Sequence, residues 1–272
     1  MIGQKNLQED INNLIAVDNY PHYSIFVGVP GSGRKTISKL IASKLGATFT
    51  IVGTSVEEIR KLIDTAYKSD MPVVYCVADA DGMSSAARNA LLKLTEEPPK
   101  SAYIVMTFAD SSNIMATLKS RAHVFEMEMY RAHHIQEYYE SKYSGDDIQL
   151  IRDFCTVPGQ VDMLAGKVQE FNDFVNKVAD NITEASISNV FKIADSIKLK
   201  ETDEDKWDLR LFWEAFSQVA VKKSFVKRVV NTTYLQWVVV TGYYVNDLKI
   251  VGLNKSAAFA MWIVDIRGCP WN

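Results

Sequence analysis

Hydrophobic residues in the first half of the chain follow two different periods. Leu7, Ile11, Leu14 and Ile15 recur at the spacing that lines one face of a helix. Elsewhere the chain carries short, continuous apolar runs of the kind that form buried strands. Strands are predicted at residues 23–28, 48–52, 71–78 and 102–108, and further helices at residues 36–45, 56–66 and 84–97. Strands that alternate with helices indicate an α/β domain with a parallel sheet, ending near residue 130.

The strand signal fades after about residue 130. Residues 146–178 predict two or three short helices, interrupted at Val157-Pro158-Gly159, and a charged run at residues 198–208 precedes a last helical block. A run of this kind is more often a solvated loop or a helix end than an interaction tail. We therefore predict three parts, of which the second and third are helical: residues 1–130, 131–182 and 183–272.

Composition limits the classes of function that fit. The 272 residues are 47% hydrophobic, so one large or two to three small domains can bury a core without covalent staples. The formal net charge of −3 argues against a protein that coats DNA through a basic surface. It permits a protein that sits beside DNA within a larger assembly.

The cysteines and the lack of long apolar segments predict a cytoplasmic protein. Cys76, Cys155 and Cys269 do not have zinc-ligand spacing, and three scattered thiols indicate a reducing compartment. The chain does not open on an apolar signal region. The most apolar stretch, residues 234–245, is interrupted by Gln236 and is too short to span a membrane. We expect no metal site and no membrane partner.

A glycine-rich segment lies between a predicted strand and a predicted helix. It reads Gly28-Val29-Pro30-Gly31-Ser32-Gly33-Arg34-Lys35-Thr36. The context is that of a phosphate-binding loop, because glycines let the backbone approach a phosphate and the helix N-terminus attracts anions. A working loop needs Lys after the last glycine, and then Ser or Thr for magnesium. Here Arg34 and Lys35 take these places, and Thr36 comes one residue late, about 100° around the helix. The alternative is a glycine-rich turn that binds nothing.

The strand predicted at residues 71–78 is followed by Asp79 and Asp81. A working ATPase ends this strand with an Asp that holds magnesium and a Glu that polarises the attacking water. Ala78 takes the first place here, and Asp79, one methylene shorter than Glu, takes the second. The alternative is that Asp79 and Asp81 are turn residues that end a strand. Because this change and that at Lys35 affect the same metal, the sequence predicts the loss of metal-assisted hydrolysis.

Two segments resemble a known family. Residues 86–99 (AARNALLKLTEEPP) are similar to the helix after the second ATP-site strand of bacterial clamp-loader subunits. Residues 114–121 (IMATLKSR) are similar to the segment that ends in the family's Ser-Arg-Cys signature, and Ile2-Gly3-Gln4 and His22-Tyr23 resemble its opening stretch. The resemblance runs to about residue 128, and more weakly to about residue 165.

The chain departs from the family at three points. Ala122 replaces the signature cysteine, the cysteine-rich zinc insert of many bacterial relatives is missing, and residues 159–162 hold no arginine where the family's lid offers one to ATP. Within the family, the chain most resembles the delta-prime subunits, whose own ATP site is typically degenerate.

The resemblance implies that the three parts are an AAA+ P-loop domain, a small helical lid and a helical collar. It implies that Arg121, in a loop that Ser120 orients, reaches across a subunit interface to a neighbour's ATP and stabilises charge on the γ-phosphate. Thr107 matches the position that senses this phosphate. The implied partners are other clamp-loader subunits, the sliding clamp and, through the assembly, primer-template DNA.

Each of these assignments has a plainer alternative. Arg121 would otherwise bridge surface carboxylates, and Thr107 would be an ordinary strand residue. Glu96, Glu97, Pro98 and Pro99 are interpreted as a simple helix end that proline terminates. The tryptophans fit either a collar interface or the domain's own core: Trp207, Trp213, Trp237, Trp262 and Trp271.

Three functions follow from the sequence. The leading one is a non-hydrolysing, delta-prime-like stator that requires no cofactor, with weak ATP, ADP or phosphate binding at Gly31 and Gly33 left open, because backbone N–H groups need no side chain. The second is an active ATPase whose loop uses Lys35 and Thr36. The third is a binding adaptor that keeps the AAA+ fold but serves no clamp.

Overall fold

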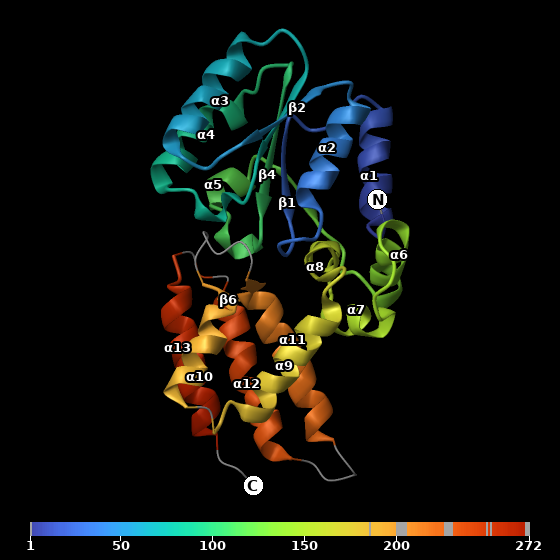
Figure 1. Ribbon diagram of the computed structural model, residues 1–272. Coiled ribbons are helices and arrows are strands. Elements are labelled where there is room, and N and C mark those ends of the chain that lie inside the picture. The colour runs from blue at the N-terminus through green and yellow to red at the C-terminus, as the bar shows by residue number, and fades with distance from the viewer. Residues whose placement is uncertain are drawn as a thin grey trace. The chain divides into compact units, whose positions relative to one another are not determined.

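The computed structural model describes residues 2–184, 186–199, 206–225, 231–248, 250 and 252–269. The chain divides into two compact units, Met1–Tyr130 and Arg131–Asn272. The first is an α/β unit and the second is mainly helical (Figure 1).

A parallel sheet of five strands, in the order β2-β3-β4-β1-β5, forms the centre of the first unit. The strands are β1 (Tyr23–Val27), β2 (Thr48–Val52), β3 (Val73–Val77), β4 (Ala102–Phe108) and β5 (His123–Glu126). The strands predicted from the apolar runs are confirmed as β1 to β4. The sequence prediction missed β5, because four residues are too few to show a period. Since all strands run parallel, their carboxyl ends lie at one edge of the sheet, where ligands bind in folds of this class.

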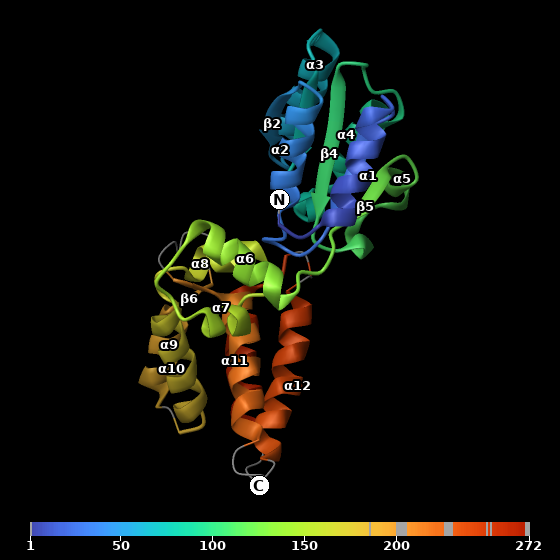
Figure 2. The ribbon, with the colours of Figure 1, turned by 90° about the vertical axis from the view of Figure 1, so that its right-hand side faces the viewer.

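Helices cover both faces of this sheet. They are α1 (Lys5–Ala16), α2 (Arg34–Lys44), α3 (Val56–Lys68), α4 (Ser85–Glu96) and α5 (Ala116–Lys119), with single turns at η1 (Ala80–Gly82) and η2 (Ser111–Asn113). Figure 1 shows α1 and α2 on one side of the strands and α3 and α4 on the other. Figure 2 shows β5 and α5 at one margin of the unit and β2 at the other.

Alternation along the strands produces the two layers. In β1, Phe26 belongs to the core beneath α1 and α2, whereas its neighbour Ile25 belongs to the core beneath α3 and α4. Successive strand side chains point to opposite faces, so a strand buried on both sides reads as a continuous apolar run. In β3, Val74 likewise belongs to the core beneath α1 and α2, and Tyr75 belongs to the core beneath α3 and α4.

The second unit contains short helices followed by long ones. They are α6 (Ala132–Lys142), α7 (Ile148–Phe154), α8 (Pro158–Leu164), α9 (Val168–Asn181), α10 (Ile187–Asp195), α11 (Leu209–Ser224), α12 (Thr232–Asp247) and α13 (Lys255–Gly268). Two-residue strands, β6 (Ile197–Lys198) and β7 (Trp207–Asp208), pair with each other. Helix α11 packs against α7, α9 and α12, and Figures 1 and 2 both show it beside α12.

Aromatic side chains fill the core of the second unit. Trp213, Trp237 and Trp262 are completely buried. The indole N–H of Trp237 donates to the carbonyl of Ile266 (3.1 Å), and that of Trp262 donates to the hydroxyl of Thr241 (3.0 Å). These three tryptophans therefore serve the unit's own core. Trp207 packs on the ring of Phe171, and Trp271 lies outside the described residues.

The interruption predicted near Val157-Pro158-Gly159 lies between α7 and α8, at residues 155–157. Pro158 is the first residue of α8, as proline can be where an N–H would have no partner. Of the charged run, residues 200–205 lie outside the described residues, and the last two residues form β7. A border between lid and collar at residue 182 stays a prediction.

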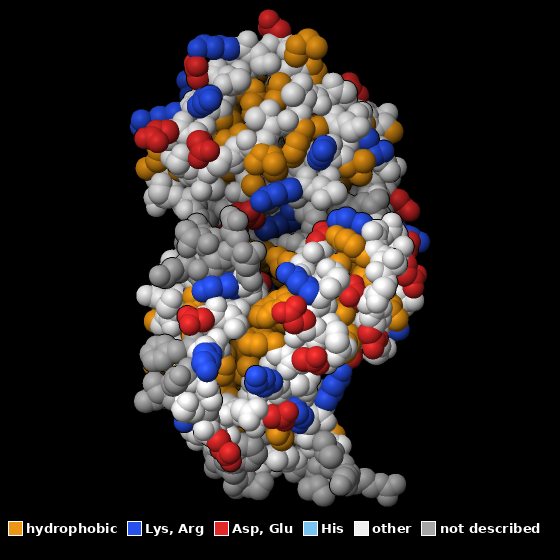
Figure 3. Space-filling model, viewed as in Figure 1, with side chains coloured by type: hydrophobic (Ala, Val, Ile, Leu, Met, Phe, Trp, Pro, Cys, Tyr) orange, Lys and Arg blue, Asp and Glu red, His pale blue; other side chains and the backbone are white. Residues whose placement is uncertain are grey.

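Charged residues of both signs mix on the surface drawn in Figure 3, in each of the two units. This agrees with the nearly balanced net charge of −3. In the part of the chain that the structure describes, no helix has both the length and the apolar character that crossing a bilayer requires.

Candidate phosphate loop and Arg121 site

The glycine-rich loop connects β1 to α2. Gly31 and Gly33 have φ angles of 83° and 94°, in the left-handed region that favours glycine. Gly28 continues the pairing of β1, because its N–H donates to the carbonyl of Phe108 (3.0 Å). Tyr130, at the other end of the unit, donates its hydroxyl to the carbonyl of Ser32 (2.8 Å). This contact, which holds the loop to the segment after β5, was not predicted from the sequence, because it joins residues about a hundred positions apart.

Arg34 is the first residue of α2 and is buried in the site. Only 5% of the residue is exposed, and its Nη2 donates to Oδ1 of Asp79 at 2.9 Å. Burial lowers the pKa of the Arg34 guanidinium, and the charges of Asp79 and Asp81 act in the opposite direction. Its Nη1 is also buried and has no hydrogen-bond partner among the described residues.

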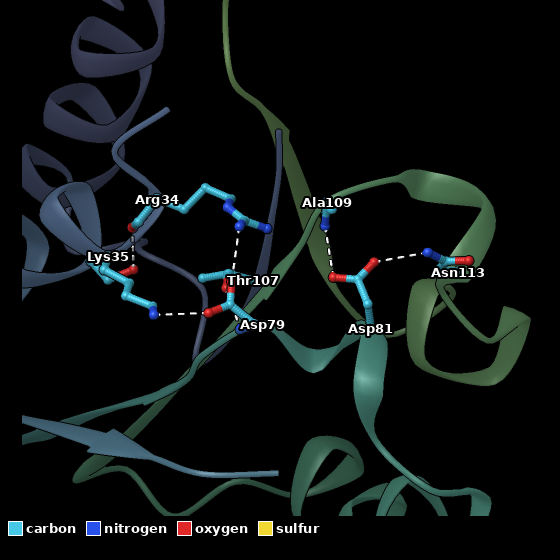
Figure 4. Close-up of polar contacts among 8 residues, drawn as sticks. Arg34, Lys35, Asp79, Asp81, Thr107, Ala109 and Asn113 are labelled. Carbon is cyan, nitrogen blue, oxygen red and sulfur yellow. Dashed lines mark hydrogen bonds and ion pairs between the residues drawn. The ribbon is translucent and has the colours of Figure 1, made fainter. Parts of the chain in front are cut away.

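Lys35 completes an ion-pair cluster around Asp79. Its Nζ lies 2.8 Å from Oδ2, so each oxygen of the Asp79 carboxylate is bonded to a different cation (Figure 4). The two pairs differ in environment, because 51% of the Lys35 side chain is exposed and only 6% of that of Arg34. A solvated pair contributes about 0–1 kcal/mol, whereas the loss of a buried partner leaves an uncompensated charge. The contact between Arg34 and Asp79 therefore dominates the energetics of the cluster.

Thr107 joins β4 to the exit of β3. The backbone N–H of Asp79 donates to its Oγ1 at 2.9 Å, and Thr107 is completely buried. Asp79 itself has φ 53° and ψ 49°, the left-handed conformation that Asp tolerates better than most residues. The structure thus brings Thr107, Asp79 and the start of α2 together at the carboxyl edge of the sheet.

Asp81 organises the segment that follows β4. Its Oδ2 accepts a hydrogen bond from the N–H of Ala109 (2.8 Å), and its Oδ1 accepts one from Nδ2 of Asn113 (2.9 Å) (Figure 4). Arg88 of α4 donates to the carbonyl of the same residue (2.9 Å). The alternative of a turn residue therefore describes Asp81 well. The sequence did not indicate Ala109 or Asn113, because this contact spans about thirty positions.

Two other predicted positions take no part in the cluster. Thr36 is exposed on the first turn of α2. Ala78 has no side-chain oxygen, and its N–H donates to the carbonyl of Val52 (3.3 Å). The predicted loop and strand thus meet at Arg34, Lys35 and Asp79, and neither of these other residues adds a ligand oxygen to the cluster.

Arg121 follows α5 and is held by two contacts. Its Nη1 donates to the carbonyl of Thr117 (2.5 Å), and its Nη2 forms an ion pair with Oε1 of Glu96 (2.6 Å). One third of the Arg121 side chain is exposed. Ser120 donates its hydroxyl to the same carbonyl of Thr117 (3.2 Å). Glu96 is thus more than a helix terminus, and the sequence does not distinguish it from Glu97.

Arg121 and the loop lie at opposite ends of the strands. β5 begins at His123, directly after Arg121, whereas the loop follows the carboxyl end of β1. The two strands are parallel, with Ser24 beside His123, so the length of β5, roughly 13 Å, separates the two places. Burial raises the pKa of Tyr23, at the amino end of β1, and the charge of Arg121 opposes this shift. That opposition agrees with a position of Arg121 near the amino end of the sheet.

Asp162 of α8 lies in the segment, residues 159–162, that the resemblance compares with the arginine-bearing part of the family's lid. Its Oδ1 accepts hydrogen bonds from Nζ of Lys142 (2.8 Å) and from the hydroxyl of Tyr143 (2.8 Å), and its Oδ2 accepts one from the hydroxyl of Tyr138 (3.0 Å). Burial acts to raise the pKa of Asp162, but these donors outweigh it, so that the pKa is lowered. The position is therefore an anion that α6 and the residue after it satisfy within the second unit.

The sheet order and the loop at the end of β1 define an AAA+ P-loop fold. Solved structures share this fold. A DNA polymerase III gamma subunit-related protein of Thermotoga maritima matches 95% of this chain and 99% of its own, with a TM-score of 0.56 and 12% identity. A RuvB mutant of the same organism matches 84% of this chain and 78% of its own, with a TM-score of 0.52 and 14% identity.

Comparisons of sequence identify relatives among AAA+ proteins. The family model described as "DNA polymerase III, delta subunit" matches residues 50–131. The DNA polymerase III subunit gamma of Buchnera aphidicola is 27% identical over 47% of this chain and 44% of its own length. The tau subunit of Escherichia coli is 24% identical over 47% of this chain and 25% of its own length. The chain thus has the AAA+ P-loop fold and is similar in sequence to DNA polymerase III gamma and tau subunits, of which it matches less than half the length.

Proposed function

We propose that the chain is a delta-prime-like subunit of a clamp loader that does not hydrolyse ATP itself. The observation that carries this proposal is the pairing of both Asp79 carboxylate oxygens with Arg34 and Lys35. In a hydrolytic site of this type, the corresponding carboxylate is available to the attacking water. Here it is already bonded to two cations of its own chain.

The residues of the loop do not fit a magnesium–nucleotide complex. Mg²⁺ requires oxygen ligands in near-octahedral geometry. The ammonium group of Lys35 has three donors and no acceptor, so it repels a metal ion where a hydroxyl would bind one. Ala78 supplies no carboxylate on the strand side. The two positions that supply magnesium ligands in the family pattern therefore carry no ligand oxygen in this chain.

A phosphate group alone fits the same loop better. Gly31 and Gly33 leave the backbone open to an anion, and the N-terminus of α2 attracts negative charge. The guanidinium of Arg34, at the first residue of α2, adds positive charge beside the loop. Weak, metal-independent binding of phosphate, ADP or ATP is thus part of the proposal, and no such ligand is required.

Arg121 is proposed to act on the ATP of a neighbouring subunit. The loop of its own chain lies at the other end of the strands, so Arg121 cannot serve the phosphates bound there. Its guanidinium is partly exposed and keeps donors free, as an arginine finger needs. A positive charge placed beside a γ-phosphate stabilises the charge that develops there during transfer.

The proposed partners follow from the relatives. A chain of the gamma/tau type would assemble with other clamp-loader subunits and act on a sliding clamp. Primer-template DNA would be met through the assembly, and the balanced charge of this chain supports an indirect contact. Within that assembly the subunit would serve as a rigid stator.

ATP turnover by the purified chain, combined with co-purification from the native host, tests this proposal. We expect no turnover by the chain alone, and recovery of sliding-clamp and clamp-loader subunits with it. Turnover of about 1 per second or more, which is the lower end of the range of kcat values for typical enzymes, would instead identify a working ATPase. Recovery of partners that include no clamp or polymerase subunit would identify an adaptor.

A further inference from the structure

Two contacts on separate elements hold the Arg121 guanidinium. The Thr117 carbonyl belongs to α5 and accepts from Nη1 (2.5 Å), while the Glu96 carboxylate ends α4 and pairs with Nη2 (2.6 Å). A guanidinium is planar, so two bonds to different nitrogens fix both its position and its orientation. Of its five N–H groups, two donate to these described residues, which leaves three for another ligand as far as the described part of the chain is concerned.

The pair between Arg121 and Glu96 has little value as a stabilising contact. The side chains are 33% and 47% exposed, and pairs this solvated contribute little to folding. A free arginine, however, has many rotamers, and ordering it on arrival of a ligand weakens the interaction. The contact therefore acts mainly on the position of the side chain.

We propose that Glu96 is a positioning residue for Arg121. It holds the guanidinium in one orientation before a neighbour's nucleotide arrives, so that the finger needs little reorganisation. This role rests on the proposed function of Arg121. Glu96 does not touch the nucleotide, and it acts only through the arginine.

The helix α4 explains why Glu96 has this role and Glu97 does not. Glu96 is the last residue of α4, whereas Glu97 already leaves the helix with φ −131° and ψ 70°. Both side chains are exposed and carry the same charge, yet only Glu96 pairs with Arg121. The two positions form a matched pair for an experiment, because each can lose its charge without a change in size.

The test uses the reconstituted clamp-loader assembly with Glu96→Gln, Glu97→Gln, Arg121→Ala and the double variant of Glu96→Gln with Arg121→Ala. For each, kcat and KM for ATP are measured, together with the melting temperature of the purified subunit. We expect Glu96→Gln to lower kcat by about tenfold, the lower end of the loss found when a partner that orients a metal ligand is removed, with KM and melting temperature unchanged. Glu97→Gln should match the wild type, and Glu96→Gln should cause no further loss when Arg121 is already Ala.

The outcomes separate the two proposals. Loss of kcat with Arg121→Ala but wild-type behaviour of Glu96→Gln would overturn the role of Glu96 and leave the finger intact. A rise in kcat with Glu96→Gln would also overturn it, since the contact would then restrain Arg121 rather than present it. A further loss in the double variant would assign Glu96 a separate role. No effect of Arg121→Ala would instead contradict the proposed function itself.

Discussion

The ammonium group of Lys35 lies 2.8 Å from Oδ2 of Asp79. In the family pattern, the first of these positions holds a hydroxyl for magnesium and the second a carboxylate for the attacking water. In this chain the two side chains bind each other, and Arg34 binds the second oxygen of the same carboxylate. Arg34 and Lys35 therefore neutralise the carboxylate that a hydrolytic site would present to the attacking water.

Removal of the Asp79 carboxylate should destabilise the first unit. We expect Asp79→Ala to lower the free energy of unfolding by about 1–2 kcal/mol, because Arg34 would be left buried without its partner. The effect should be smaller than the about 3–5 kcal/mol of a fully buried pair, since the Asp79 side chain is 55% exposed. Urea unfolding followed by far-ultraviolet circular dichroism measures this, because all tryptophans lie in the second unit.

Lys35→Ala is the control for this cluster. It removes a solvated contact to the same carboxylate and should change the free energy of unfolding by no more than about 0.5 kcal/mol. Equal losses for Asp79→Ala and Lys35→Ala would contradict the dominant role of Arg34.

Binding of a fluorescent ATP analogue should not depend on magnesium. The loop offers backbone N–H groups and cations to phosphates, and Lys35 and Ala78 supply no oxygen at the two positions that hold the metal in the family pattern. Titrations in millimolar MgCl₂ and in EDTA should therefore give equal affinities for the analogue, to within about twofold. An affinity at least about tenfold higher with magnesium would show that the metal is bound together with the nucleotide.

Asp81→Ala should loosen the segment between β4 and α5. The change removes the acceptor of both the Ala109 N–H and the Asn113 side chain, at a cost of about 1–3 kcal/mol in the free energy of unfolding. Asp64→Ala is the matched control, because that carboxylate forms an exposed ion pair with Lys68 on the surface of α3. If both variants unfold at the same urea concentration as the wild type, Asp81 does not organise this segment.

The pH dependence of the second unit should reflect Asp162. Hydrogen bonds from Lys142, Tyr143 and Tyr138 lower its pKa in the folded state below the value of about 3.9 in the unfolded chain. A carboxyl group whose pKa is lowered by folding stabilises the folded state at any pH above its unfolded-state pKa. This stability is lost as the pH falls through its folded-state pKa. Asp162→Asn should therefore show a shallower loss of stability below about pH 5 than the wild type.

Tryptophan fluorescence during urea unfolding between pH 7 and pH 3 provides this measurement. Asp173→Asn is the control, because that exposed carboxylate accepts one hydrogen bond, from Gln169 (2.9 Å). A wild-type acid response in Asp162→Asn would contradict the assignment.

The sequence predicted those parts of the fold that depend on local pattern. β1 to β4 are buried apolar runs, and α2 and α3 have helical spacing, so both follow from side-chain periodicity. β5 is too short to show a period. The break between α7 and α8 was predicted from Pro158, but the sequence could not show that proline opens the second helix rather than ending the first, because it can do either.

The candidate site was predictable in its residues but not in its contacts. The identity of Lys35 shows that a hydroxyl is missing, yet its bond to Asp79 joins positions more than forty residues apart. The choice of Glu96 over Glu97 as the partner of Arg121 depends on where the last turn of α4 ends. Composition and spacing contain no information on either distance.

The central claim is that Arg121 acts on the ATP of a neighbouring subunit. Its most direct test is single-turnover ATP hydrolysis by the reconstituted assembly that contains Arg121→Ala, compared with Lys119→Ala, which removes an exposed charge from the same segment. An arginine finger supplied in trans contributes about 10³–10⁵ in rate in GTPases. We predict that one class of ATP site slows by at least about a hundredfold in the Arg121 variant, while assembly is intact and Lys119→Ala matches the wild type. Unchanged hydrolysis at every ATP site of an intact Arg121→Ala assembly would contradict the account.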